Sequence, residues 1–157
     1  MRDNLLETAP AKSSTAGSIF VSTGANSIAQ RPVLSATVNT QETRTLTTFD
    51  DLATTGPQIT ATTGDKAILM YAAQMANSGA NEQCVVGWAV TGASSVAADD
   101  DNSLNFEQSS AGNQDVRAAD VRRLTGLTAG SNVVTLKYRV TAGTGTFRRR
   151  HAILIGL

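Results

Sequence analysis

Hydrophobic and polar residues alternate along most of the chain after residue 41. This pattern predicts β-strands, because successive side chains of a strand point to opposite faces. The clearest case is the segment 132–140, whose apolar residues share one face: Val134, Leu136, Tyr138 and Val140. A second alternating run, 146–155, follows a turn-forming Thr-Ala-Gly-Thr-Gly segment at 141–145. Two such runs around a turn are typical of a β-hairpin, so we predict that the chain closes with one.

Turn signals divide the preceding sequence, and they bound shorter predicted strands at 44–49 and 58–62. A further short strand fits the residues 104–106. The longer segments 66–77 and 83–91 are apolar on both faces. Such segments are typical of central strands, or of strands whose outer face another subunit covers. A helix is the alternative for 66–77, but its strand-rich neighbourhood favours a strand.

The segment 114–124 fits either a strand or a short helix, and we favour the strand. The predicted strands then number about eight, enough for two packed antiparallel sheets. Only 17% of the residues are charged, and alanine, threonine, serine and glycine are abundant, a composition typical of strands and tight turns. We therefore predict an all-β antiparallel sandwich over residues 41–157, with 92–113 as a long surface loop.

Residues 1–40 contain few large apolar side chains, scattered among serine, threonine, alanine and asparagine. The segment is predicted to be an extended N-terminal arm, because it cannot bury enough apolar surface to offset the entropy of ordering it alone. Either a partner surface holds the arm or it packs against its own domain. We favour the partner surface.

Thirteen basic residues balance thirteen acidic ones, so no overall charge directs the protein to nucleic acid or to a membrane surface. The distribution is uneven, however. Residues 79–115 hold six acids and no base, whereas 116–157 hold eight lysines and arginines and one aspartate. Two alternatives follow: the two blocks meet within one fold, or they meet between neighbouring copies and fix the register of an assembly.

Few residues offer catalytic chemistry. Cys84 lies in an apolar run and is interpreted as a small buried hydrophobe, and a single cysteine forms no internal disulfide. His151 is the only histidine, and no serine sits in a nucleophile-elbow sequence. No segment has the length or pattern of a spanning helix or a signal peptide. We expect no enzyme activity, no cofactor and no membrane partner.

Two charged motifs admit other interpretations. The oxygens of Asp99-Asp100-Asp101 are suitable for calcium, but the loop lacks the glycine and the later glutamate of an EF-hand. We interpret it as a solvated loop. The run Arg148-Arg149-Arg150 lies in a predicted strand, which would distribute its side chains over both faces, and aromatic residues for base stacking are scarce. We therefore expect ion pairs rather than nucleic-acid binding.

Several segments resemble those of tailed-bacteriophage virion proteins. The segment 14–32 (STAGSIFVSTGANSIAQRP) is similar to one that recurs in fibre and head-appendage proteins. The remaining segments resemble virion domains with a trimeric jelly roll of the tumour-necrosis-factor type: 48–57 (TFDDLATTGP), 88–93 (WAVTGA), 124–132 (LTGLTAGSN), 135–140 (TLKYRV) and 143–147 (GTGTF). The resemblance implies a jelly-roll fold, a homotrimer and a structural role without catalysis.

These observations lead to the hypothesis of a capsid decoration (cement) protein, made in the host cytoplasm and carried on the outside of the head. Its expected partners are two further copies and the major capsid protein, with no small-molecule substrate. The expected capsid contacts lie in the arm: Leu5, Leu6, Ile19, Phe20, Val21 and Arg31. The expected subunit contacts are aromatic residues and arginines: Tyr71, Tyr138, Arg148 and Arg150.

Two alternatives remain open. A tail-fibre or receptor-binding tip would recognise the host through the 92–113 loop. A lectin or carbohydrate-active enzyme would need paired carboxylates or an aromatic platform, and only Tyr71, Trp88 and Tyr138 are candidates for the latter. We favour the decoration protein.

Overall fold

The computed structural model describes residues 16–25, 27–109 and 114–157, and these residues form ten strands. The strands are β1 (Ser18–Gly24), β2 (Ser27–Val38), β3 (Glu42–Arg44), β4 (Gln58–Thr63), β5 (Lys66–Asn77), β6 (Glu82–Gly92), β7 (Leu104–Gln108), β8 (Val116–Thr125), β9 (Gly130–Val140) and β10 (Gly145–Gly156). In this described part of the chain, no helix is long and apolar enough to cross a membrane. The predicted strand at 114–124 is confirmed, as is the one at 66–77.

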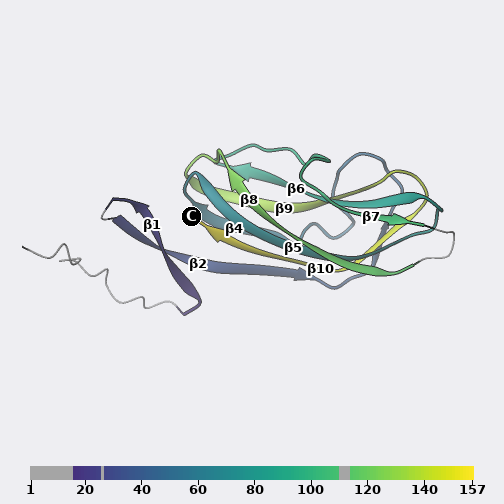
Figure 1. The fold of residues 1–157 in the computed structure, drawn as a ribbon, viewed down its shortest axis with the longest axis horizontal. Coiled ribbons are helices and arrows are strands. Elements are labelled where there is room, and N and C mark those ends of the chain that lie inside the picture. The colour runs from purple at the N-terminus through teal and green to yellow at the C-terminus, as the bar shows by residue number, and fades with distance from the viewer. Residues whose placement is uncertain (1–15, 26, 110–113) are drawn as a thin grey trace, which may run out of the picture.

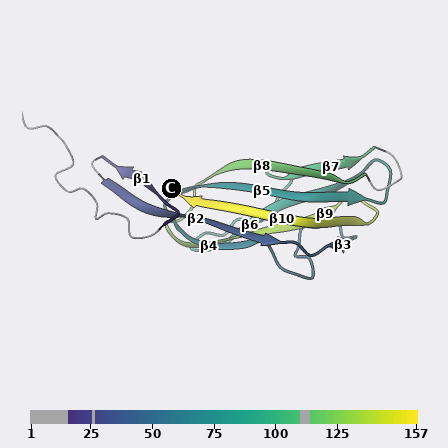
Figure 2. The same ribbon diagram turned by 90° about the horizontal axis from the view of Figure 1, so that it is seen from below.

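The strands form two antiparallel sheets packed face to face, a jelly-roll sandwich (Figures 1 and 2). One sheet has the order β1-β2-β10-β5-β8, and β3 adds to β10 beside it. The other has the order β4-β9-β6-β7. The all-β prediction is therefore confirmed, with ten strands rather than about eight, because part of the predicted arm forms strands.

The core lies between the sheets and follows the alternation of the sequence. In β9 the inward residues are those predicted, and Leu136, Tyr138 and Val140 are fully buried. They face β5 and β10, which send in alternate residues of their own, including Leu69, Met75, Phe147 and Leu154. Tyr138 and Phe147 meet edge to face, with ring centroids 5.1 Å apart. Apolar burial of about 25 cal/mol per Å² makes this double layer the main source of stability.

The predicted closing hairpin is wrong, although both of its strands are present. β9 and β10 lie in opposite sheets, so the turn between them carries the chain across the sandwich. The β5–β6 connection holds this turn: the Asn77 side-chain amide donates to the Ala142 carbonyl (3.1 Å), and the Ser78 amide donates to the Thr144 carbonyl (3.1 Å). Because β9 and β10 lie in opposite sheets, their apolar faces pack against each other across the core. Two strands paired within one sheet would instead lie side by side, with their apolar faces pointing in the same direction.

The predicted N-terminal arm is partly a strand of the body. Residues Val33–Val38 of β2 pair with Arg150–Ile155 of β10, and their inward side chains Leu34 and Ala36 pack on the core. Only β1 and the first half of β2 project, as a hairpin beyond the end of the sandwich at which β10 finishes (Figure 1). Packing against its own domain therefore holds for residues 33–38, and the partner surface stays a prediction for the projecting part. Leu5 and Leu6 lie outside the described residues.

A β-bulge interrupts β10 where Arg149 and Arg150 together oppose Ala73 of β5. Arg149 has a φ of 48°, in the left-handed region that a non-glycine residue rarely adopts. The extra residue reverses the alternation. Phe147 points inward before the bulge, and Arg150 points inward after it, as do Ala152 and Leu154. The predicted regular alternation of the three arginines is corrected accordingly.

The inward turn buries Arg150 completely, and the surrounding chain provides partners for both of its terminal nitrogens, while Nε has no hydrogen-bond partner in the described chain. Nη2 pairs with Glu42 Oε2 at 2.7 Å and donates to the Thr40 carbonyl, while Nη1 donates to the carbonyls of Thr54 and Gly56. The Tyr138 hydroxyl also donates to the Gly56 carbonyl, at 2.9 Å. One cation thus fixes the 40–56 connection, which has little regular structure of its own.

Replacing Arg150 by Met should destabilise the fold by about 3 to 5 kcal/mol, because it leaves Glu42 unpaired in a mostly buried site. Chemical denaturation measures this loss. The control is Arg139→Met, which breaks a pair with Asp100, whose side chain is 60% exposed. That change should cost about 0 to 1 kcal/mol. Equal losses in the two variants would contradict the central role of Arg150.

The same pair predicts a dependence of stability on pH. Burial raises the pKa of the Glu42 carboxyl, but hydrogen bonds from Thr54 and the charge of Arg150 lower it more, so that it ends below its ordinary value of 4.5. A lowered pKa stabilises the fold at neutral pH, and this contribution is lost as the pH falls through the folded-state pKa.

Denaturation of the wild type and of Glu42→Gln from pH 7 down to pH 3 tests this dependence. The wild type should be more stable at pH 7, and the difference should shrink below about pH 4.5, where its carboxyl begins to take up a proton. A difference that stayed constant over the whole range would exclude Glu42 as the group responsible.

Candidate functional site

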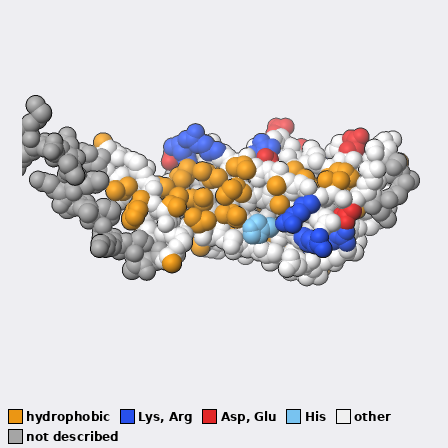
Figure 3. All heavy atoms as spheres, turned by 60° about the horizontal axis from the view of Figure 1, so that its bottom comes forward, with side chains coloured by type: hydrophobic (Ala, Val, Ile, Leu, Met, Phe, Trp, Pro, Cys, Tyr) orange, Lys and Arg blue, Asp and Glu red, His pale blue; other side chains and the backbone are white. Residues whose placement is uncertain are grey.

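The outer face of the sheet β2-β10-β5-β8 carries an apolar surface that we call the apolar face. Its members point away from the core on four neighbouring strands: Val33 on β2, Ile153 and Ile155 on β10, Ile68, Met70 and Ala72 on β5, and Ala119 and Val121 on β8. Figure 3 shows hydrophobic side chains gathered on this side of the molecule, with a histidine and several basic side chains toward one end.

The strand register makes the apolar face continuous. Ile155 lies opposite both Val33 and Ile68, and Met70 lies opposite both Ile153 and Val121. Val121 is 63% exposed, the largest value among the large hydrophobic side chains of the described chain. Three inter-strand spacings give the face a width of about 14 Å. A contiguous exposed apolar surface is a feature of interaction sites, so the apolar face is the first candidate site.

A hollow interrupts the apolar face where the side chains are small. Ala72 and Ala119 form its floor, and Met70, Val121 and His151 stand around it, enclosing about 250 Å³. The lining is almost wholly apolar. A bulky apolar side chain of a second protein molecule would fill it, as complementary packing at an interface core requires.

The structure places the predicted subunit contacts elsewhere. Tyr138 and Arg150 are completely buried and Tyr71 nearly so, all three within the core of one chain. Their interior positions correct the expectation that they contact a neighbouring subunit. Arg148 is half-exposed on the outer side of β10, where it forms an ion pair with Asp115.

Sequence reasoning chose these contacts by residue type and therefore missed the apolar face. The available signal was the two-sided apolarity of 66–77, for which coverage by another subunit was one explanation. In β5 the inward residues are Leu69 and Tyr71, and the outward ones are Ile68 and Met70. The choice of face follows only from the register with β10 and β8.

Burial also keeps two reactive side chains of the core protonated at neutral pH. It raises the pKa of the Cys84 thiol to about 11, and this thiol donates to the Ala76 carbonyl. Burial, followed by the nearby Asp120 carboxylate, raises the pKa of Tyr71 to about 12. Neither group supplies a nucleophile at neutral pH. The interpretation of Cys84 as a small buried residue is confirmed.

The projecting hairpin, defined here as residues 18–32, forms a second exposed feature. Ile19 is 37% and Phe20 49% exposed, and β1 lies at the edge of its sheet with one side unpaired among the described strands. Val21 is only half-exposed. An unpaired strand edge presents backbone donors and acceptors for strand addition by another chain.

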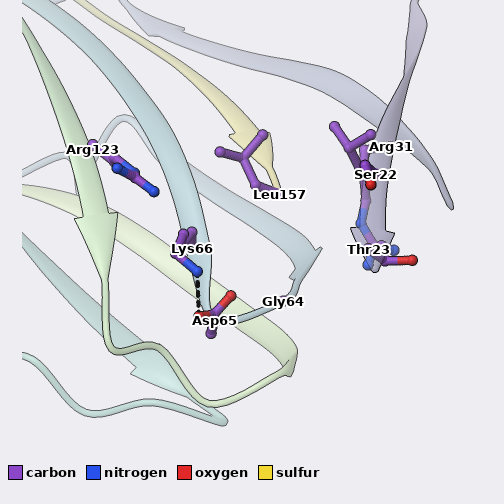
Figure 4. A pocket seen from close by; sticks show the side chains of 9 residues that line it. Ser22, Thr23, Arg31, Gly64, Asp65, Lys66, Arg123 and Leu157 are labelled. Carbon is purple, nitrogen blue, oxygen red and sulfur yellow. Dashed lines mark hydrogen bonds and ion pairs between the residues drawn. The ribbon is translucent and has the colours of Figure 1, made fainter. Parts of the chain in front are cut away.

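A cleft of about 560 Å³ separates the hairpin from the end of the sandwich. Ser22, Thr23 and Arg31 line it from the hairpin, and the sandwich contributes Gly64, Asp65, Lys66, Arg123 and Leu157 (Figure 4). Lys66 is already tied to Asp65 at 2.5 Å. The buried Nε of Arg31 has no hydrogen-bond partner in the described chain.

The acidic and basic blocks meet in part within one chain. Arg139 contacts Asp100 at 2.7 Å, and Arg148 pairs with Asp115. For these two contacts, the acidic and basic blocks therefore meet within one fold. Each ion pair is individually weak, because its carboxylate is accessible to solvent. By contrast, Arg117 and Arg149 make no hydrogen bond or ion pair in the described chain.

Two of the three carboxylates of the candidate calcium loop have partners within the chain. Asp99 accepts hydrogen bonds from the backbone and side chain of Asn102, and Asp100 pairs with Arg139. In the described ranges, no group of three or more histidine, cysteine or acidic side chains is positioned to hold a metal. Of the predicted 92–113 loop, the described residues 92–109 pair with the body through β7 and through the bridge between Val90 and Val96.

The sequence matches no protein-family description and no curated protein. The fold is similar to the solved structure of Eiger TNF from S. frugiperda, with a TM-score of 0.46 and 15% sequence identity over 81% of this chain and 94% of that chain. At this level of identity, the similarity concerns the fold alone.

Proposed function

We propose that the protein is a structural component that assembles as a homotrimer through its apolar face and binds a larger protein surface through its projecting hairpins. The observation that carries this proposal is the continuous apolar face on one side of the sandwich. A second copy is the occupant that we favour, because the face extends over four neighbouring strands of one sheet and the segments that resemble trimeric jelly rolls imply self-association.

Burial of the apolar face would provide the energy for association. Met70, Ile153 and Val121 lie at its centre, and a fully buried side chain of this size contributes about 1.5 to 3 kcal/mol. The hollow at Ala72 would add shape complementarity to the buried area of the interface. The three-fold number of copies rests on the resemblance to trimeric jelly rolls of the segments 48–57, 88–93, 124–132, 135–140 and 143–147.

The hairpin suits a role as the anchor to the larger surface. It carries exposed Ile19 and Phe20 on a strand whose outer edge pairs with no other described strand, so it offers both apolar contacts and backbone hydrogen bonds. Three hairpins on one trimer would act together, since the second and third bind at high effective concentration once the first is bound.

The larger surface that we propose is the outer shell of a bacteriophage head, where the protein would act as a decoration protein on the major capsid protein. The resemblance of segment 14–32 to phage fibre and head-appendage proteins supports a virion surface, and that segment includes the hairpin. We choose the head because the chain has only a short arm where such fibre proteins often carry a long shaft. A protein that binds only the mature shell stabilises it, as any ligand stabilises the state that it prefers.

Met70→Asp should convert the trimer to a monomer, because it would place an unpaired charge at the centre of the buried face. Analytical ultracentrifugation or light scattering measures the mass. Met70 points outward, so circular dichroism should show an intact fold.

The matched control for this variant is Leu46→Asp, since Leu46 is 54% exposed and lies outside the apolar face. It should remain trimeric. A monomeric wild type, a dimer, or a trimeric Met70→Asp variant would each contradict the proposed assembly.

Phe20→Asp should leave the trimer intact and abolish binding to purified heads, with at least a tenfold loss, because three anchors are weakened at once. Co-sedimentation with heads measures this binding, and Leu46→Asp serves again as the control. A truncation for the same purpose should begin at Val33, because removal of residues through Thr40 deletes the β2 segment paired with β10.

Electron microscopy of labelled particles completes the test of location. Label on the head supports the decoration role. Label on the tail would overturn it and favour the receptor-binding alternative, while undiminished binding by Phe20→Asp would overturn the role of the hairpin.

A further inference from the structure

We propose that Thr37, Asn39, Arg117, Arg149 and His151 form a binding site for a phosphate or sulfate group. These residues line a surface hollow of about 350 Å³ at the outer side of the sheet β2-β10-β5-β8. The site lies within one chain and does not depend on the proposed trimer.

Three strands bring polar side chains to this hollow. Thr37 lies at the end of β2, Arg149 and His151 lie on β10, and Arg117 comes from β8 on the other side of β5. Asn39, directly after β2, completes the lining of the hollow. The donors therefore reach the hollow from different directions.

The charge around the hollow is unbalanced. Arg117 and Arg149 form no ion pair in the described chain, and no carboxylate lines the hollow. The nearest acidic partner in sequence, Asp115, is engaged by Arg148 and by the Gln74 side-chain amide at 2.7 Å. Two unpaired guanidinium groups facing one space favour a doubly charged anion.

The backbone of Arg149 supports the same conclusion. Its φ of 48° places a non-glycine residue where a bulge commonly uses glycine, a conformation that is strained for a side chain with a Cβ atom. Such conformations persist at ligand sites more often than elsewhere. Here the bulge directs the Arg149 side chain to the exposed side of the strand while Arg150 enters the core.

His151 is held in position by Thr37, whose hydroxyl lies 2.7 Å from Nδ1. When the hydroxyl donates to Nδ1, the proton of a neutral ring is on Nε2, which is then a donor. Two guanidinium forks and an imidazole donor can engage separate oxygens of a tetrahedral group. A carboxylate has only two oxygens, which a single fork already satisfies.

Isothermal titration with inorganic phosphate, at constant ionic strength in chloride buffer, tests the site on the full chain. The wild type should show saturable binding. Arg149→Gly and Arg117→Gln should each weaken it about tenfold or more, as expected for the loss of a charge-assisted hydrogen bond. Glycine adopts a φ of 48° without strain, so the melting temperature of the Arg149→Gly variant should be no lower than that of the wild type.

The matched control is Arg123→Gln, which removes the same charge from an exposed position on β8 outside the hollow. It should bind phosphate as the wild type does. Absence of saturable binding in the wild type, or equal weakening by Arg123→Gln and Arg149→Gly, would overturn the proposal.

A parallel titration with glycerol 3-phosphate distinguishes the source of the group. Comparable affinity for the ester supports a phosphate carried by a larger molecule, and binding of inorganic phosphate alone supports a free ion. Sedimentation of the same samples records the oligomeric state, so a failure of the trimer is separable from a failure of the anion site.

Discussion

The β-bulge at Arg149 is the constraint on which both faces of the main sheet depend. A strand without it would continue the alternation set by Phe147 and would send Ile153 and Ile155 into the core. The extra residue instead turns Arg150 inward and both isoleucines outward. The buried cation that fixes the 40–56 connection and the apolar face on the opposite side of the strand therefore have one structural cause.

How far the sequence predicts this fold depends on which physical signal each element carries. Alternation identified β4, β9 and β10 and the inward set of β9, because burial on one face leaves a period of two. It failed at 44–49, where only Arg44 belongs to a strand, and it did not reveal β1 and β2. It did not predict the partner of a strand, so β9 and β10 appeared to be a hairpin although they face each other across the core. The bulge carries no local signal, since it falls within three arginines and contains no glycine. The apolar face was missed for the same reason: its members follow from register and not from residue type.

The N-terminal segment shows why composition alone does not identify a strand near the edge of a sheet. In β2 only Leu34, Ala36 and Val38 face inward between Val33 and Val38, and small polar residues alternate with them. The average hydrophobicity is low, so the segment resembles a free arm. Its backbone is nevertheless held by the ladder to β10, and a few inward side chains suffice because that ladder supplies the hydrogen bonds.

This anchoring changes how the hairpin would act in the proposed assembly. A flexible tether searches a large volume, and each copy loses conformational entropy when it binds. The first half of β2 is the second strand of the hairpin, and the second half of β2 pairs with β10. The hairpin therefore leaves the sandwich in a direction set by the β2–β10 ladder (Figure 2). Three copies related by symmetry would then present their hairpins at fixed mutual distances. Such preorganisation restricts binding to surfaces whose sites have matching spacing, so recognition would depend on the geometry of an array as well as on the chemistry of Ile19 and Phe20.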